Sequence, residues 1–129
     1  MSKIIDVFES KANLLVGDGV SEKEIIEAEK VLKLSFSDEY RDYLRKYAVA
    51  AYNGHELTGI TKSPRVNVVD VTLNERKNNP DIPAELYVIE QTDVEEIVIW
   101  QSGNGQVFCS SPNQGLTQLC NSLADYISK

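Results

Sequence analysis

Apolar residues recur at helical spacing through the first third of the chain. Between Ser2 and Leu15, apolar side chains lie three or four positions apart, at Ile5, Phe8, Ala12 and Leu15. This spacing predicts an amphipathic helix over about residues 2–15, which Asp18-Gly19 ends. The apolar face of such a helix is the one that packs against a core.

Two further helices begin with recognisable cap sequences. Ser21 and Glu24 have the S-x-x-E form of a capping box. Apolar residues then follow on one stripe to about Lys33: Ile25, Ala28, Val31 and Leu32. Ser37 precedes two acids, which suit the positive end of the next helix. That helix carries an aromatic-rich stripe at positions i, i+3, i+4 and i+7, which we expect to be buried: Tyr40, Tyr43, Leu44 and Tyr47.

The middle of the chain mixes strand and helix patterns. Asn53-Gly54 marks a turn, and residues 55–60 have the pattern of a short strand. Residues 66–77 contain several β-branched side chains, which favour a strand. Three of the apolar residues nevertheless fit a helical stripe: Val66, Val69 and Leu73. Asn67 is a suitable N-cap, so we predict a helix that ends at Asn78.

Three apolar runs predict an antiparallel meander: residues 86–89, 96–101 and 106–110. Asn104-Gly105, between the last two runs, is a strong hairpin sequence. The first run is apolar on both faces, which predicts a central strand. Trp100 lies among apolar neighbours, so we expect it in the core.

The C-terminal pattern predicts a last amphipathic helix, with apolar positions at Leu116, Leu119, Cys120, Leu123 and Ile127. No internal repeat or linker interrupts the 129 residues. Helices flanking a small antiparallel sheet define the α+β class. We therefore expect a single domain that spans residues 1–129.

Most of the net negative charge lies in the last two fifths of the chain. Residues 1–77 carry 13 acidic and 12 basic residues, a net charge of −1, whereas residues 78–129 carry seven acidic residues and one basic residue, a net charge of −6. Such a field repels nucleic acid and anionic membranes, and it attracts basic partners.

Four acids lie within seven residues, at Glu90, Asp93, Glu95 and Glu96. We expect them on an exposed loop that joins two strands. With His55 and Glu56 on a neighbouring strand edge, they are the candidate partner-binding residues. An acidic loop that only keeps the protein in solution is the alternative.

The sequence contains no recognisable catalytic, metal-binding or cofactor-binding pattern. The one histidine, His55, lies beside a turn and far in sequence from either cysteine. Cys109 and Cys120 lack the spacing of a zinc site, so we expect buried, reduced thiols. Glu95 and Glu96 would point to opposite faces of a strand instead of converging on a metal ion. We therefore expect a protein that is not an enzyme and has no cofactor.

The order of these elements resembles the SUKH superfamily, which includes yeast cell-wall regulators and bacterial immunity proteins of polymorphic toxin systems. The resemblance begins with the capped helix, its turn and the tyrosine-rich helix, at residues 19–29, 32–34 and 40–47. Four later segments are similar to one bacterial branch: residues 52–60, 68–76, 86–90 and 122–127. Phe36-Ser37 stands where the family commonly has Leu-Pro. The similarity extends over about residues 15–128.

The resemblance implies a binding function, because the family shares no catalytic residues. It implies an immunity protein that binds a cognate toxin, often a nuclease domain, and covers its active site or substrate groove. Such toxins belong to polymorphic toxin and contact-dependent inhibition systems. The alternative is a regulatory interaction module that acts on a cellular protein. Asp6 falls where an export signal needs apolar residues, so we expect a cytoplasmic protein without a membrane segment.

Overall fold

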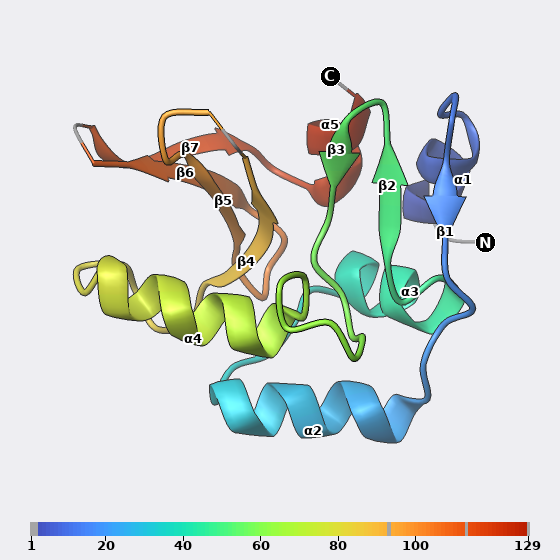
Figure 1. Ribbon diagram of the computed structural model, residues 1–129, viewed down its shortest axis with the longest axis horizontal. Helices are drawn as coiled ribbons and strands as arrows, with labels where there is room; N and C mark the ends of the chain where they lie inside the picture. Colours follow the sequence, from blue (N-terminus) through green and yellow to red (C-terminus); the bar gives the residue numbers. More distant parts are fainter. Residues whose placement is uncertain (1–2, 93, 113, 129) are drawn as a thin grey trace.

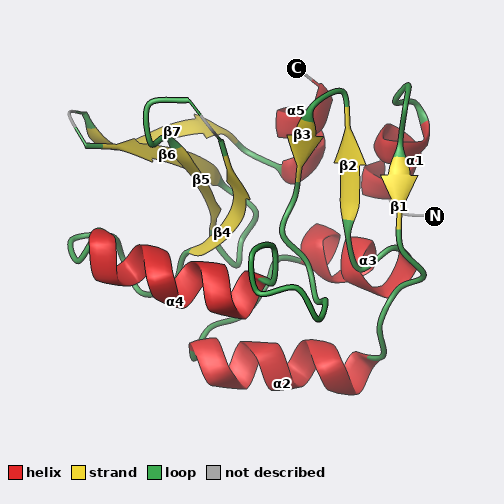
Figure 2. Ribbon diagram, in the orientation of Figure 1, coloured by secondary structure: helices red, strands yellow, loops and turns green. Residues whose placement is uncertain are grey.

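Two antiparallel sheets organise the chain, with helices packed around them (Figure 1, Figure 2). The computed structural model describes residues 3–92, 94–112 and 114–128. The first sheet contains β1 (Leu15–Val16), β2 (Ala50–Tyr52) and β3 (His55–Glu56), in that order. The second contains β4 (Tyr87–Gln91), β5 (Val98–Gln101), β6 (Val107–Ser111) and β7 (Gly115–Cys120). The helices are α1 (Lys3–Glu9), α2 (Glu22–Leu32), α3 (Asp38–Lys46), α4 (Val68–Asn78) and α5 (Leu123–Ser128). The predicted α+β class is confirmed.

The segment after β3 joins the two sheets. The Thr58 amide donates to the Ile89 carbonyl at 2.9 Å, and the Thr58 hydroxyl donates to the Val88 carbonyl at 2.8 Å. Leu57 also forms a β-bridge with Glu90. The sequence predicts a central strand at this position, but β4 is the first strand of its four-stranded sheet. Its outer edge is paired with residues 57–58. Both of its faces are apolar because Tyr87 and Ile89 lie in one buried cluster and Val88 in the other.

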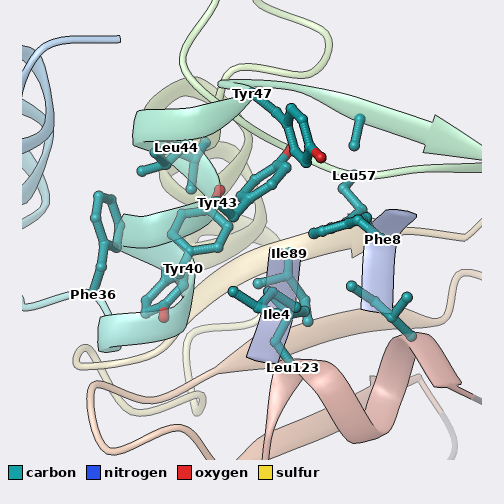
Figure 3. Packing of buried hydrophobic residues seen from close by; sticks show 14 of the residues in the cluster. Ile4, Phe8, Phe36, Tyr40, Tyr43, Leu44, Tyr47, Leu57, Ile89 and Leu123 are labelled. Carbon is teal, nitrogen blue, oxygen red and sulfur yellow. The ribbon is translucent and has the colours of Figure 1, made fainter. Parts of the chain in front are cut away.

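The core is rich in aromatic side chains from α1, α3 and β4 (Figure 3). The Phe8 and Tyr43 rings stack at 5.2 Å, and the Phe36 ring meets Tyr87 edge-on at 4.8 Å. The buried phenols of Tyr40, Tyr43 and Tyr87 are hydrogen-bonded, as burial requires. Tyr43 donates to the Thr58 carbonyl at 2.7 Å, so α3 also holds the segment that joins the sheets.

The first and last helices pack against each other within this core. Ile4 and Phe8 of α1 belong to the same buried cluster as Leu123 and Ile127 of α5. Figure 3 shows Leu123 beside Ile4. Glu39 of α3 holds the start of α5, because its carboxylate accepts hydrogen bonds from the amides of Leu123 at 2.5 Å and Ala124 at 3.1 Å.

A second, smaller cluster lies between α4 and the four-stranded sheet. It contains Val71, Leu86, Val88, Val98 and Trp100. Trp100 is fully buried, as predicted, and its indole donates to the Ser110 hydroxyl at 2.9 Å. Figure 1 shows α4 along this sheet, with α2 next to it.

The predicted caps of the three central helices are confirmed. The capping box of Ser21 and Glu24 is present, and Ser37 and Asn67 cap α3 and α4. The buried stripe of α4 differs from the predicted one, because Val68, Val71 and Thr72 face the interior while Leu73 is 39% exposed. Val31 of α2 is also exposed. Neighbouring positions of α4 are similarly apolar, so the sequence pattern alone does not determine which face of the helix points to the core.

The first predicted helix is shorter than expected. α1 ends at Glu9, and the chain reverses through Asn13, whose φ of 60° is left-handed. Leu15 then pairs with Ala51 as part of β1. Its side chain is 73% exposed, so the prediction that it belongs to a helical apolar face is wrong.

Residues 115–120 form a strand and not the first turns of a helix. β7 pairs with β6, and Gly115 has a φ of 65° at the turn that starts it. Leu116 packs against the second cluster, whereas the last helix begins only at Leu123. Cys120 therefore ends a strand, and both Cys109 and Cys120 are partly buried thiols.

Candidate functional site

A cleft of about 530 Å³ opens where the two sheets meet. It lies between β3, the loop at residues 65–66, the end of β4 and the turn that follows. Charged side chains and apolar ones both line it, among them His55, Glu56, Arg65, Glu90, Val94 and Ile97. The cleft therefore combines three of the six candidate residues.

Glu90 contributes a buried carboxylate to this cleft. The residue is 4% exposed. One carboxylate oxygen lies 2.9 Å from His55 Nδ1, and the other accepts a hydrogen bond from the Tyr126 hydroxyl at 2.5 Å. The expectation that Glu90 lies on an exposed loop is wrong, because β4 continues through this residue and β3 covers it. Burial and the Glu90 carboxylate both raise the pKa of Tyr126, so this phenol stays protonated and continues to donate.

His55 covers the Glu90 carboxylate from the solvent side. The Asn53-Gly54 turn, with both residues at positive φ, places His55 directly opposite Tyr52. The two rings stack at 5.1 Å, and the His55 side chain remains 47% exposed. Burial, with a smaller effect from Glu90, raises the pKa of Tyr52 to about 12. The imidazole is therefore oriented by Glu90 and Tyr52 together, while one of its edges reaches solvent.

Glu56 forms an ion pair with Arg65 at the rim. Two guanidinium nitrogens lie 2.5 and 3.0 Å from the two carboxylate oxygens, which is a bidentate arrangement. The hydrogen bond from Arg65 lowers the pKa of Glu56. Glu56 remains charged at neutral pH, and part of its field is neutralised by Arg65.

The turn after β4 presents Glu95 and Glu96 to solvent. The Ile97 amide donates to the Val94 carbonyl at 3.0 Å, and the two central residues have φ values of 51° and 58°. Positive φ at both central positions is the pattern of a type I′ turn. The sequence had placed Glu96 at the start of a strand, but β5 begins at Val98. Asp93 lies outside the described residues.

Two features of the site bear on catalysis and metal binding: the contacts of His55 and the grouping of potential metal ligands. In the described part of the chain, His55 contacts Glu90 and Tyr52, and no serine or cysteine hydrogen-bonds to its ring. No group of three potential metal ligands occurs among these residues. The sequence did not indicate Tyr126 or Arg65, because neither lies in a motif and both reach the site only through the fold.

These observations define the class of protein: an α+β protein with a polar cleft between its two sheets. The chain belongs to the SUKH family, since the SUKH_5 model, described as SMI1-KNR4 cell-wall, matches residues 1–129. This family includes immunity proteins, and its members are generally non-catalytic.

A solved structure supports the same fold. A protein from Pseudomonas syringae pv. tomato is similar with a TM-score of 0.73 and 17% sequence identity, over 96% of this chain and 92% of that one. A comparison with curated proteins gives no match. Within residues 3–92, 94–112 and 114–128, no helix has the length and apolar character needed to cross a membrane.

Proposed function

We propose that this protein is a cytoplasmic immunity protein that binds a cognate toxin domain and covers its active site or substrate groove. The observation that carries the proposal is the cleft itself. Glu56 and Glu90 line it, and Glu95 and Glu96 lie beside it. The chain belongs to a family that includes immunity proteins, which supports the same function. The toxin it fits is basic, as nuclease domains are.

Charge supports this choice of partner. A nuclease groove is positively charged because it holds phosphates, and an acidic protein competes for the same cations. The C-terminal part of this chain, residues 78–129, carries a net charge of −6. The acids at the cleft belong to this part, apart from Glu56.

The turn conformation also supports a role for Glu95 and Glu96. Each holds a left-handed φ that costs a non-glycine residue about 1–2 kcal/mol. A turn selected for stability alone would carry Asn-Gly at these positions, as the chain does at Asn53-Gly54, where both residues also have positive φ. Two acids at strained positions fit a selection for charge at the tip of this turn.

The test is protection from a toxin domain encoded next to this protein's gene. Co-expression of that domain should stop growth, and this protein should restore it. Stopped-flow association should then show a rate that falls with salt, because long-range attraction between exposed charges is screened over about 8–10 Å at moderate salt.

Paired charge reversals separate the site from the overall field. The Glu95→Lys, Glu96→Lys protein should associate about tenfold more slowly, with a weaker salt dependence. Glu27→Lys with Asp81→Lys changes the net charge equally at two exposed positions remote from the cleft residues in sequence, and should have a smaller effect. Equal rates for the two double variants would refute the site, and the absence of any protection would refute the immunity function.

A further inference from the structure

Among the residues that the structure describes, no helix covers the outer face of the β1–β2–β3 sheet (Figure 1). In Figure 1 these strands lie in front of α1, α3 and α5, which pack behind them. Leu15, Ala51 and Glu56 are paired across this sheet, so their side chains share one face. Leu15 is the most exposed large apolar residue in the described part of the chain, at 73%.

This face contains an apolar hollow, defined here by Leu15, Val49, Ala51 and Val66. Its volume is about 400 Å³. Glu56 and Arg65 line both this hollow and the polar cleft, so their ion pair forms a shared wall. The two depressions are therefore adjoining parts of one surface, apolar on the β1 side and acidic on the β4 side.

We propose that the apolar hollow anchors the toxin: it receives an apolar side chain of the toxin while the acidic side faces the basic groove. The proposal rests on the proposed immunity function and adds to it the position of the main apolar contact. An interface with an apolar centre and a polar margin is the usual arrangement in protein complexes.

Charge favours a basic protein over a second copy of this chain as the occupant. Each copy has a net charge of −7, so two copies repel each other. Glu56, which lines the hollow, and the exposed Glu95 and Glu96 at the turn after β4 would attract a cationic surface and disfavour an identical acidic one. A basic protein with an exposed apolar residue beside its groove could place that residue in the hollow and its basic groups against the acidic side.

The exposure of Leu15 is not explained by folding. The core is complete without it, and exposed edge strands usually carry a lysine, a proline or another protective feature. β1 consists of Leu15 and Val16, which are both apolar and both exposed. Together with the hollow that they line, Leu15 and Val16 form a contiguous exposed apolar area, which is typical of a contact site for another molecule.

The two halves of the surface should control different rates. Exposed charges act at a distance and mainly change the association rate, whereas apolar contacts form only in the complex and mainly change the dissociation rate. Leu15 variants should therefore differ from the Glu95 and Glu96 variants in which rate constant they alter.

The experiment measures both rate constants by surface plasmon resonance, with the neighbouring-gene toxin domain immobilised in a catalytically inactive form. Leu15→Ala should raise the dissociation rate about fivefold with little change in association rate. Leu15→Arg should raise the dissociation rate about tenfold or more, and its added positive charge should also slow association. Val31→Arg is the matched control, because Val31 is 57% exposed on α2 and lines neither depression. It introduces the same charge and should leave the dissociation rate unchanged. Thermal unfolding checks that all three variants fold.

Three results would overturn the proposal. If wild type binds the toxin and Leu15→Arg dissociates no faster than Val31→Arg, the anchor lies elsewhere and the immunity function stands. If wild type binds no such toxin, both proposals fail. If the protein alone is a dimer in light scattering and Leu15→Arg makes it a monomer, a second copy covers the hollow.

Discussion

At the scale of single residues, the turn at Glu95 and Glu96 has a cost that can be measured. Replacing the pair by Asn-Gly should raise the free energy of unfolding by about 2 kcal/mol, because Asn and Gly adopt left-handed φ more readily. Urea denaturation measures this change.

A second variant separates strain from charge at the same turn. Glu95→Gln with Glu96→Gln removes the mutual repulsion and keeps the unfavourable φ values. It should change stability by less than about 0.5 kcal/mol, since the two carboxylates are exposed. Stabilisation equal to that of the Asn-Gly protein would show that repulsion, and not backbone conformation, is the cost.

Residues with local partners were the ones that the sequence predicted well. Ser21 caps α2 through Glu24, three positions away, and Asn67 caps α4 through the next amides. Glu90 could not be placed in this way. Its partners His55 and Tyr126 are 35 and 36 positions away, and no sequence spacing links them.

At the scale of elements, α5 depends on a side chain from another helix. Glu39 accepts two backbone amides of α5 and one amide hydrogen of Gln101. Glu39→Ala should destabilise the protein by about 2–3 kcal/mol, because these buried donors lose a charged acceptor. Hydrogen exchange should show faster opening of residues 123–128 than of β5.

The neighbouring acid provides the control for this prediction. Asp38 is in the same first turn of α3, but its side chain is 99% exposed and pairs with Arg41 in the same helix. Asp38→Ala should cost about 0.5 kcal/mol or less. Similar losses in both proteins would mean that Glu39 acts through the α3 dipole and not through α5.

Elements fixed by tertiary pairing were the ones that the sequence missed. Residues 115–120 have apolar positions that fit a helix, yet β6 offers a free edge and the chain pairs with it. Leu15 likewise fits a helical face but pairs with β2. In both segments the hydrogen bonds of a distant strand outweigh the local periodicity.

At the scale of the whole molecule, all six tyrosines have raised pKa values, with burial as the main cause. The unfolded chain ionises its tyrosines near pH 10, whereas the folded protein keeps them protonated. The unfolded state therefore loses protons first, and stability must fall as the pH rises above about 10. Below that pH the stabilisation is fully present.

The expected loss is about 1.4 kcal/mol per pH unit for each tyrosine that remains protonated. Tyrosinate absorbance should therefore appear together with the loss of circular dichroism in an alkaline titration. Tyr52→Phe should make the fall less steep between pH 10 and about 12, the range over which Tyr52 contributes. Tyrosinate that forms gradually while the fold persists would contradict this account.

The cleft was predictable only in part from the sequence. The acidic segment was evident, and the prediction that His55 and Glu56 lie near Glu90 agrees with the structure. The apolar hollow was not foreseen, because Leu15 and Val66 belong to segments that meet only after β1 has paired with β2. Sequence patterns report the faces of single elements, whereas a surface shared by several elements depends on the fold.

The contact between α1 and α5 determines when this protein can complete its fold during synthesis. Ile4 and Phe8 are made more than a hundred residues before Leu123 and Ile127, against which they pack. While the ribosome is still translating, α1 leaves the exit tunnel with its apolar face exposed. It remains without its final neighbours until more than a hundred further residues have emerged. The contact between α1 and α5 therefore forms late in synthesis, and the apolar face of α1 is prone to aggregation until α5 has been made.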